Sequence, residues 1–253
     1  MRLLDRDRAQ GAMELDIGTE LDTGRDTGAQ DAAWGTPAPR EPSWPATMTV
    51  LAILGLYMAL PEELTFGPTG IVPALALALL APLTLARRQG RHTGLRQWRV
   101  AALTLIAVIN AANVGSLGLL VRALLRGGTV HGVKVVGGQL LLAAVAIWLT
   151  NALVFALWYW ELDRGGPDER SHPDHRQPDF LFPQMTTPHC THATWAPIFL
   201  DYLYVSFTNA TAFSPTDTMP LTPWAKALML VQALASLLTI ALVAARAVNI
   251  LGS

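Results

Sequence analysis

Five long stretches of the chain contain no Asp, Glu, Lys or Arg. They cover residues 42–61, 64–86, 100–121, 135–160 and 227–245, and each is about 20 residues long and rich in apolar side chains. An α-helix rises about 1.5 Å per residue, so about 20 apolar residues cross a hydrocarbon core of about 30 Å. We therefore predict a multi-span membrane protein that has the lipid bilayer as its surroundings.

The composition excludes several other classes of protein. Apolar residues make up 51 % of the chain and charged residues 15 %, whereas soluble domains carry about 25 % charge. A net charge of −1 provides no basic surface, so we expect no nucleic-acid partner. The chain has no P-loop, dinucleotide fingerprint or Ser-His-Asp set, and we expect neither enzymatic activity nor a cofactor.

The expected fold class is all-α, a polytopic membrane helix bundle with five or six transmembrane helices. Residues 1–45 are predicted to form a disordered N-terminal tail, because their apolar residues are too sparse to bury a core. The transmembrane domain then covers 46–251. We expect spans at about 46–60, 71–86, 100–121, 135–160 and 224–250, a polar linker over 161–195, and a segment of ambiguous character over 196–222.

The charges between the spans predict an orientation in the cell membrane. The 87–99 connection holds five arginines and no acid, which is typical of a cytoplasmic loop and places the N-terminus inside as well. The 122–134 connection should then face outward, yet it carries Arg122, Arg126 and Lys134. These basic residues conflict with simple alternation of the spans unless they extend from the helix ends toward the interface.

The segment 201–222 is rich in hydroxyl side chains and in aromatic residues near its start. Its charge-free part, 202–216, has 15 residues, which is short for a full span. A helix that enters the bilayer and returns through irregular backbone is tolerated only where protein encloses it or a cavity lies beside it. Two topologies follow: six spans with both ends inside, or five spans plus a re-entrant pore helix. We favour the second, because Asp201 and the hydroxyl groups suit a polar cavity better than lipid.

The same segment resembles the pore module of potassium-channel-like proteins, in which an outer helix, a pore helix, a filter, a Pro-x-Thr turn and an inner helix follow in order. Asp217 aligns with the filter aspartate, and Pro220 and Thr222 align with the turn. Residues 212–216 read Ala-Phe-Ser-Pro-Thr where the family has Thr-Val-Gly-Tyr-Gly. Both filter glycines are absent, so the resemblance does not imply potassium selectivity. The residues that align with the pore helix are Tyr204, Ser206, Phe207, Thr208 and Thr211.

A larger part of the chain, roughly 44–251, resembles a family of bacterial multi-span membrane proteins whose function is not established. The resemblance rests on Trp-Tyr-Trp-Glu-Leu-Asp-Arg-Gly-Gly-Pro over 158–167, on Asp-Phe-Leu-Phe-Pro-Gln-Met over 179–185, and on the 201–222 segment. It implies an integral membrane protein and identifies no catalytic residues.

These patterns favour a channel-like pore formed by a homo-oligomer, because one pore loop needs several copies around an axis. A non-conducting structural or interaction protein is the alternative. A small-solute transporter is disfavoured, since no inverted repeat and no charged residue in mid-span are evident. The predicted pore-lining residues are Thr208, Thr211, Ser214, Thr216, Asp217, Gln232 and Ser236.

The linker also gathers most of the histidines and the single cysteine. A His-x-x-His pair followed by His-Cys-x-His contains ligand types that bind zinc or copper. The surrounding sequence is polar and offers no evident scaffold, so we interpret these side chains as solvated loop residues and predict no metal site. The candidates are His172, His175, His189, Cys190 and His192.

Overall fold

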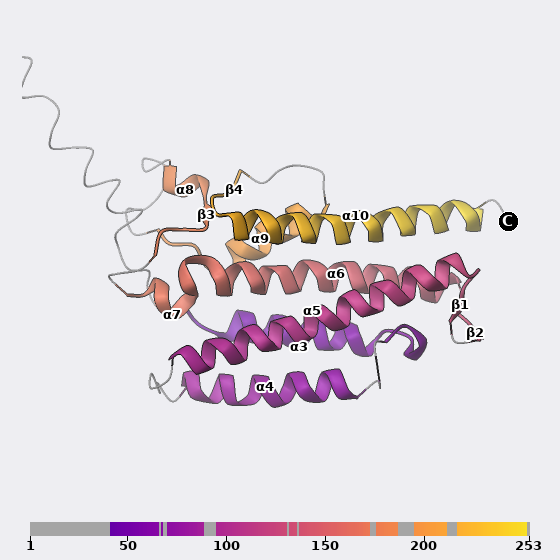
Figure 1. Ribbon diagram of the computed structural model, residues 1–253, viewed down its shortest axis with the longest axis horizontal. Helices are drawn as coiled ribbons and strands as arrows, with labels where there is room; N and C mark the ends of the chain where they lie inside the picture. Colours follow the sequence, from indigo (N-terminus) through magenta and orange to yellow (C-terminus); the bar gives the residue numbers. More distant parts are fainter. Residues whose placement is uncertain are drawn as a thin grey trace, which may run out of the picture.

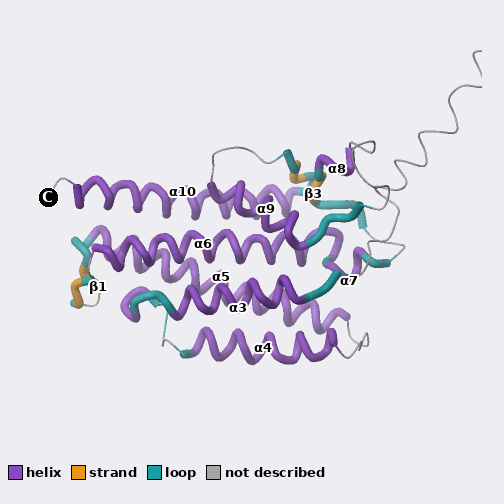
Figure 2. Tube along the Cα trace, turned by 180° about the vertical axis from the view of Figure 1, so that it is seen from behind, coloured by secondary structure: helices purple, strands orange, loops and turns teal. Residues whose placement is uncertain are grey.

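The computed structural model is an elongated bundle of helices (Figures 1 and 2). Its long helices lie side by side along one axis. They are α3 (Trp44–Met58), α4 (Ile71–Arg88), α5 (Leu95–Leu125), α6 (Gly137–Leu162) and α10 (Pro223–Leu251). The structure describes residues 41–65, 67, 70–88, 95–130, 132–135, 137–172, 176–186, 195–211 and 217–251.

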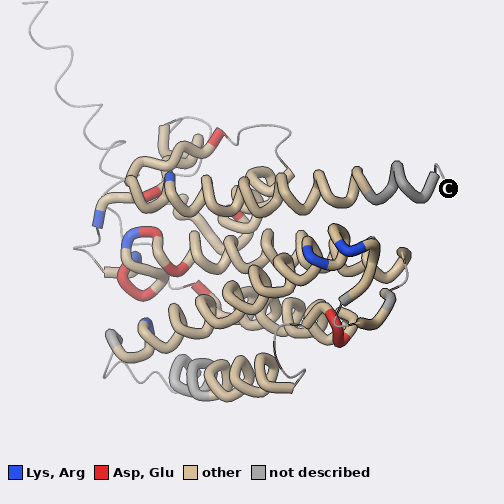
Figure 3. The backbone as a smooth tube through the Cα atoms, turned by 45° about the vertical axis from the view of Figure 1, so that its right-hand side comes forward, with Lys and Arg blue, Asp and Glu red and all other residues tan. Residues whose placement is uncertain are grey.

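Three of these helices are long and apolar enough to cross a membrane. The qualifying stretches are Gln97–Leu125, Gly137–Gly165 and Pro223–Ala245. Two further apolar helices, Trp44–Met58 and Ile71–Ala81, are shorter. The charged residues of the described chain gather mostly toward the two ends of the bundle and leave few charges in its middle (Figure 3). The predicted all-α fold with membrane-spanning helices is confirmed to this extent.

Helix α6 is the centre of the bundle and contacts α3, α5, α9 and α10. Its sequence is apolar on all sides, as expected of a helix with neighbours all around it. Small side chains, among them Ala143, Ala152 and Ala156, are almost completely buried along it. Small residues allow helix backbones to approach closely in membrane bundles, so α6 forms the axis on which the other helices pack.

One end of the bundle, here the hairpin end, is closed by short elements. The turn η1 (Glu62–Leu64) follows α3, and strands β1 (Thr129–Val130) and β2 (Val133–Lys134) pair between α5 and α6. Leu64 is fully buried there. The far part of α10 also reaches this end, where Leu242 packs beside the core that contains Leu140.

The opposite end carries a folded cap. It consists of η2 (Asp163–Gly165), α7 (Pro167–Arg170), β3 (Phe180–Leu181), α8 (Pro183–Thr186) and β4 (Met219–Pro220), with β3 antiparallel to β4. The sequence suggested a polar linker over 161–195, but the described part of this region is packed. Arg170, Phe180, Phe182 and Met185 are all buried in it. The aromatic and aliphatic residues of the 179–185 motif form most of that core. The polar residues around them make the region look like a linker when its composition is averaged.

The helix boundaries differ from the expected spans by a few residues. The tail predicted over 1–45 lies outside the described residues up to position 40, and α3 has already begun at Trp44. Pro45 stands in the first turn of α3. Proline is well tolerated there, because backbone N–H groups in the first turn of a helix have no acceptor within the helix and none is lost.

Helix α9 (Phe199–Thr211) starts at the cap end and descends along α6. The ring of Phe199 lies 5.8 Å from that of Trp160, near the end of α6. At the other end of α9, the carbonyl of Ala210 accepts a hydrogen bond from the indole of Trp148, midway along α6. Strand β4 then lies back at the cap, paired with β3. The chain between residues 199 and 220 therefore begins and ends at the same end of the bundle (Figure 1).

Candidate functional site

Gln232 of α10 lies fully buried between α6 and α9 and uses its whole amide group. The amide oxygen accepts hydrogen bonds from the Tyr159 hydroxyl at 2.5 Å and from Asn209 Nδ2 at 2.8 Å. The amide nitrogen donates to the Ser206 carbonyl at 2.9 Å and to Ser206 Oγ at 2.7 Å. An unpaired amide is costly in apolar surroundings, and this one is fully paired. We call Tyr159, Ser206, Asn209 and Gln232 the glutamine clamp.

Further polar bonds extend the clamp along α6. Asn151 Nδ2 donates to Ser236 Oγ at 2.8 Å, and the Ser206 hydroxyl donates to the Ala152 carbonyl at 2.6 Å. Asn209 Nδ2 also donates to the Met229 carbonyl at 2.9 Å. Each bond joins two different helices, so the C-terminal half of α9 is fixed to both α6 and α10.

The expected pore-lining residues fall into separate places. Gln232 and Ser236 point into the interior of the chain and are bonded there. The hydroxyls of Thr208 and Thr211 bond to carbonyls of their own helix, with both residues half-buried. Asp217 is exposed at the cap. Ser214 and Thr216 lie outside the described residues. The structure thus brings Gln232 and Ser236 together as packing groups of α10.

The outward face of α9 and α10 is apolar. On α10 the exposed residues include Leu230, Leu234 and Leu237, and on α9 they include Tyr204 and Phe207. The polar residues Gln232, Ser236 and Thr239 of the same α10 are buried. This distribution is the one that lipid, or a neighbouring apolar helix, favours around a membrane bundle.

A second polar cluster lies in the cap around Arg170, whose side chain is fully buried. One of its nitrogens donates to the carbonyls of Trp160 and Asp163, at 2.8 and 3.0 Å. Another donates to Glu41 Oε1 at 3.1 Å, while Glu41 Oε2 accepts from the Trp160 indole at 2.6 Å. Burial acts to lower the pKa of Arg170, but Tyr202, Glu41 and Asp163 outweigh it and raise that pKa above its ordinary value. Arg170 is therefore a fixed buried cation.

Asp163 joins the two sequence motifs of this end. Its Oδ2 accepts from the Tyr202 hydroxyl of α9 at 2.6 Å, and its Oδ1 accepts from the Asp179 N–H at 2.8 Å. Asp179 in turn accepts from the Arg164 N–H at 3.0 Å. Arg164 has φ 54°, a conformation that is uncommon for a side-chain-bearing residue. The motifs over 158–167 and 179–185, separated in sequence, therefore meet above the start of α9.

The histidine and cysteine candidates do not form a site in the described chain. His172 is exposed, and His175, His189, Cys190 and His192 lie outside the described residues. Over the part of the chain that the structure describes, no three His, Cys, Asp or Glu side chains are grouped in a way that could hold a metal ion.

Among the residues that carry these clusters, the sequence did not single out Tyr159, Asn209, Glu41 and Arg170. A signal existed for Asn209, because it follows Ser206 by three positions and so shares its face of the helix. No local pattern identifies Glu41, whose partner Arg170 is 129 positions away.

Comparison of the chain with protein-family models, with curated proteins and with solved structures gives no match. Function is therefore inferred from the residues and their geometry.

Proposed function

We propose that this chain is a multi-span protein of the cell membrane that forms a channel-like pore as a homo-oligomer. In this proposal α3, α4, α5, α6 and α10 traverse the bilayer, and α9 is a re-entrant helix. The observation that carries it is the position of α9, since residues 199 and 220 both lie at the cap end. The 13 residues of α9 give a length of about 20 Å, less than the bilayer core of about 30 Å.

The chemistry at the end of α9 supports passage of cations. The C-terminus of a helix carries a partial negative charge from its unpaired carbonyls. That end of α9, at Ala210, reaches the middle of α6 beside Trp148. Asp217 adds an exposed carboxylate where the chain returns to the cap. The proposed pathway is therefore negative both at its opening, beside Asp217, and inside the bundle, at the end of α9.

The proposed lining differs from the set expected from sequence in one respect. Thr208, Thr211, Ser214, Thr216 and Asp217 remain the lining candidates. Gln232 instead holds α9 through the glutamine clamp, and Ser236 is bonded to Asn151 of α6. Copies of the chain would meet through the apolar outer face of α9 and α10, which contains Tyr204 and Leu234.

The orientation proposed from the charge pattern places the cap in the cytoplasm. The arginine-rich 87–99 connection joins α4 to α5 at that end. Of its five arginines, Arg99, in the first turns of α5, is the one whose side chain lies within the described residues. Arginine-rich connections favour the cytoplasmic side. The pore loop would then open toward the cytoplasm.

A non-conducting membrane protein is the second candidate. The observation that favours it is the internal pairing of Gln232 with Ser206 and Asn209, which makes α9 an ordinary packed element of the bundle.

Currents through planar bilayers that contain the purified protein distinguish the two candidates. The pore proposal predicts a conductance that Asp217→Ala reduces and that Asp168→Ala, a change at another exposed acid of the cap, leaves unchanged. Absence of current with several cations, together with a monomeric protein in detergent, would support the non-conducting alternative.

A further inference from the structure

Four polar side chains stand near the midpoints of α5 and α6 and make no hydrogen bond within the described chain. Ser116 of α5 is fully buried, and Asn113 of α5 and Thr150 of α6 are each 6 % exposed. Asn110 of α5 completes the group. Its Oδ1 and the Oγ of Ser116 are both enclosed with no hydrogen-bond partner beside them. We call these four residues the polar seam.

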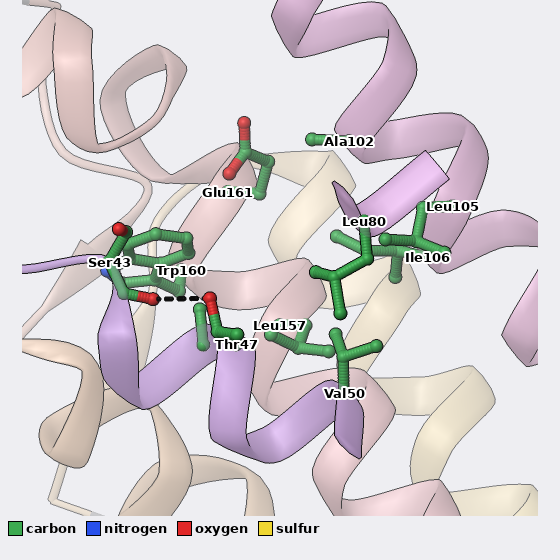
Figure 4. A pocket seen from close by; sticks show the side chains of 11 residues that line it. Ser43, Thr47, Val50, Leu80, Ala102, Leu105, Ile106, Leu157, Trp160 and Glu161 are labelled. Carbon is green, nitrogen blue, oxygen red and sulfur yellow. Dashed lines mark hydrogen bonds between the residues drawn. The ribbon is translucent and has the colours of Figure 1, made fainter. Parts of the chain in front are cut away.

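The polar seam continues the wall of a pocket that opens among α3, α4, α5 and α6 (Figure 4). Ile106 of α5 and Leu157 of α6 both line this pocket. Asn113 follows Ile106 by two helical turns, so the two share one face of α5. Thr150 precedes Leu157 by two turns and shares its face of α6 in the same way. Both helices therefore turn the polar seam toward the side on which the pocket lies.

The register of α5 and α6 brings the two sides of the polar seam to one level. Helix α5 begins at the cap end and α6 finishes there, so the two helices are antiparallel (Figure 1). Ala102 of α5 and Glu161 of α6 line the pocket, and Figure 4 shows both toward the same end of it. Asn113 lies 11 residues beyond Ala102, and Thr150 lies 11 residues before Glu161. Each is therefore about 16 Å deeper in the bundle.

The pocket provides a route to the polar seam from the cap end. Its volume is about 50 Å³, and a single water molecule needs about 10–15 Å³ on this measure. Ser43 and Thr47 stand where α3 begins, and the Thr47 hydroxyl donates to the Ser43 carbonyl at 3.1 Å (Figure 4). Beyond the polar seam, toward the hairpin end, Leu64 and Leu120 are fully buried. The route is therefore open toward the cap and closed by apolar packing on the other side.

The missing partners of the polar seam must be small, because neither a lipid nor a second copy of the chain can reach a fully buried serine. Buried polar groups that lack a partner are costly, and proteins satisfy such groups with ordered water. The amide groups of Asn110 and Asn113 both donate and accept hydrogen bonds, and so does water, whereas a metal cation only needs acceptors.

The surroundings of the polar seam disfavour ions. No charged residue stands on α5 between Arg99 and Arg122, or within 135–160 on the α6 side. The deeper walls of the pocket, among them Val50 and Leu157, are apolar. An ion that loses its hydration shell there finds no opposite charge, which is strongly unfavourable, whereas uncharged water crosses at a much lower cost.

We propose that the polar seam is a binding site for water in the middle of each chain, reached from the cap end through the pocket and closed to ions. The site belongs to α5 and α6 of one copy and goes beyond the cation pathway proposed at α9. It places a hydrated, uncharged crevice within a bundle whose long helices are otherwise apolar.

The reactivity of an introduced thiol tests this proposal, because the thiolate is the reactive form and burial in apolar surroundings suppresses it. The full chain, with Cys190 replaced by Ala, is reconstituted in liposomes as Ser116→Cys. The matched control is Ser236→Cys, at an equally buried serine of α10 that is bonded to Asn151. Methyl methanethiosulfonate, a small uncharged reagent, should modify Ser116→Cys at least about tenfold faster than the control, since one unit of thiol pKa changes the thiolate fraction about tenfold. The charged sulfonatoethyl analogue should modify neither position.

Equal rates at the two positions would overturn the proposal, and rapid modification of Ser116→Cys by the charged analogue would overturn the exclusion of ions. Asn113→Leu, added to Ser116→Cys, should slow the uncharged reagent toward the control rate, because the amide that holds water is lost. An unchanged rate in that double variant would show that the polar seam does not bind the water. Should Ser116→Cys fail to fold, Thr150→Cys probes the α6 side of the same site, with the same expected and contradicting rates.

Discussion

The phenol oxygen of Tyr159 lies 2.5 Å from the amide oxygen of Gln232, 73 positions further along the chain. This bond joins α6 to α10, and the same amide oxygen accepts from Asn209 of α9. Three helices therefore meet at one fully paired amide. If α9 moved away, several of these polar groups would be left without partners in apolar surroundings, which is costly. The paired amide therefore fixes the position of α9.

Gln232→Leu should weaken the bundle. The change removes four hydrogen bonds and leaves Asn209 and Ser206 without this partner. Hydrogen bonds between membrane helices contribute about 0.6 kcal/mol each on average, so the loss of four should lower the free energy of unfolding by about 2–3 kcal/mol. Denaturant unfolding in mixed micelles measures it.

The control for this change is Thr239→Val. Thr239 is also buried on α10, but within the described chain its hydroxyl donates to the carbonyl of Ala235, in the same helix. Its replacement should alter stability by less than about 1 kcal/mol. Equal effects of the two substitutions would show that the clamp does not hold α9.

Glu41→Gln should destabilise the cap. It removes the carboxylate that pairs with Arg170, and Arg170 stays cationic because a guanidinium is not deprotonated in proteins. Removing one partner of a buried ion pair costs about 3–5 kcal/mol. Glu41 is slightly exposed, with 8 % of its side chain accessible, so we expect the lower part of this range. Thermal unfolding, followed by the fluorescence of the tryptophans, is the measurement.

A second substitution separates charge from packing in this prediction. Replacing Arg170 by Met in the Glu41→Gln protein removes the unpaired cation, so part of the lost stability should return. If the double variant is no more stable than Glu41→Gln alone, then the buried charge is not the cause of the loss.

Cysteine labelling tests which ends of the bundle share a side of the membrane. Asp217→Cys at the cap and Leu125→Cys at the hairpin end both introduce exposed positions, in a chain where Cys190 has been replaced by Ala. An impermeant maleimide applied to intact cells should label Leu125→Cys alone. Labelling of both positions would mean that the two ends do not lie across the bilayer from one another, and labelling of Asp217→Cys alone would reverse the proposed orientation.

The sequence predicts the long apolar helices well because their signal is local. The charge-free run over 135–160 corresponds closely to α6, which covers Gly137–Leu162, since each such run follows directly from the cost of placing charge in lipid. The cap could not be predicted in this way. Its core joins Asp163 to Asp179 and Tyr202, and no pattern within a short window contains pairings over such separations.

The same distinction applies to the candidate site. The length and hydroxyl content of 202–216 identified α9 as unusual, because both are properties of one segment. The direction in which Gln232 and Ser236 point depends on which face of α10 meets α6 and α9. Gln232, Ser236 and Thr239 mark one polar face of α10. Such a face can meet either neighbouring helices or a pore, so its polarity alone does not choose between the two.

The most direct test of the proposed pore is the reversal potential of the current across a bilayer with a salt gradient of potassium chloride. We predict a measurable current whose reversal potential lies on the cation side, because the end of α9 and Asp217 present negative charge, and we predict a shift toward zero in Asp217→Asn. A bilayer in which the reconstituted protein carries no current, or one whose reversal potential is the same in Asp217→Asn as in the wild type, would contradict the assignment of the 199–222 segment as a pore.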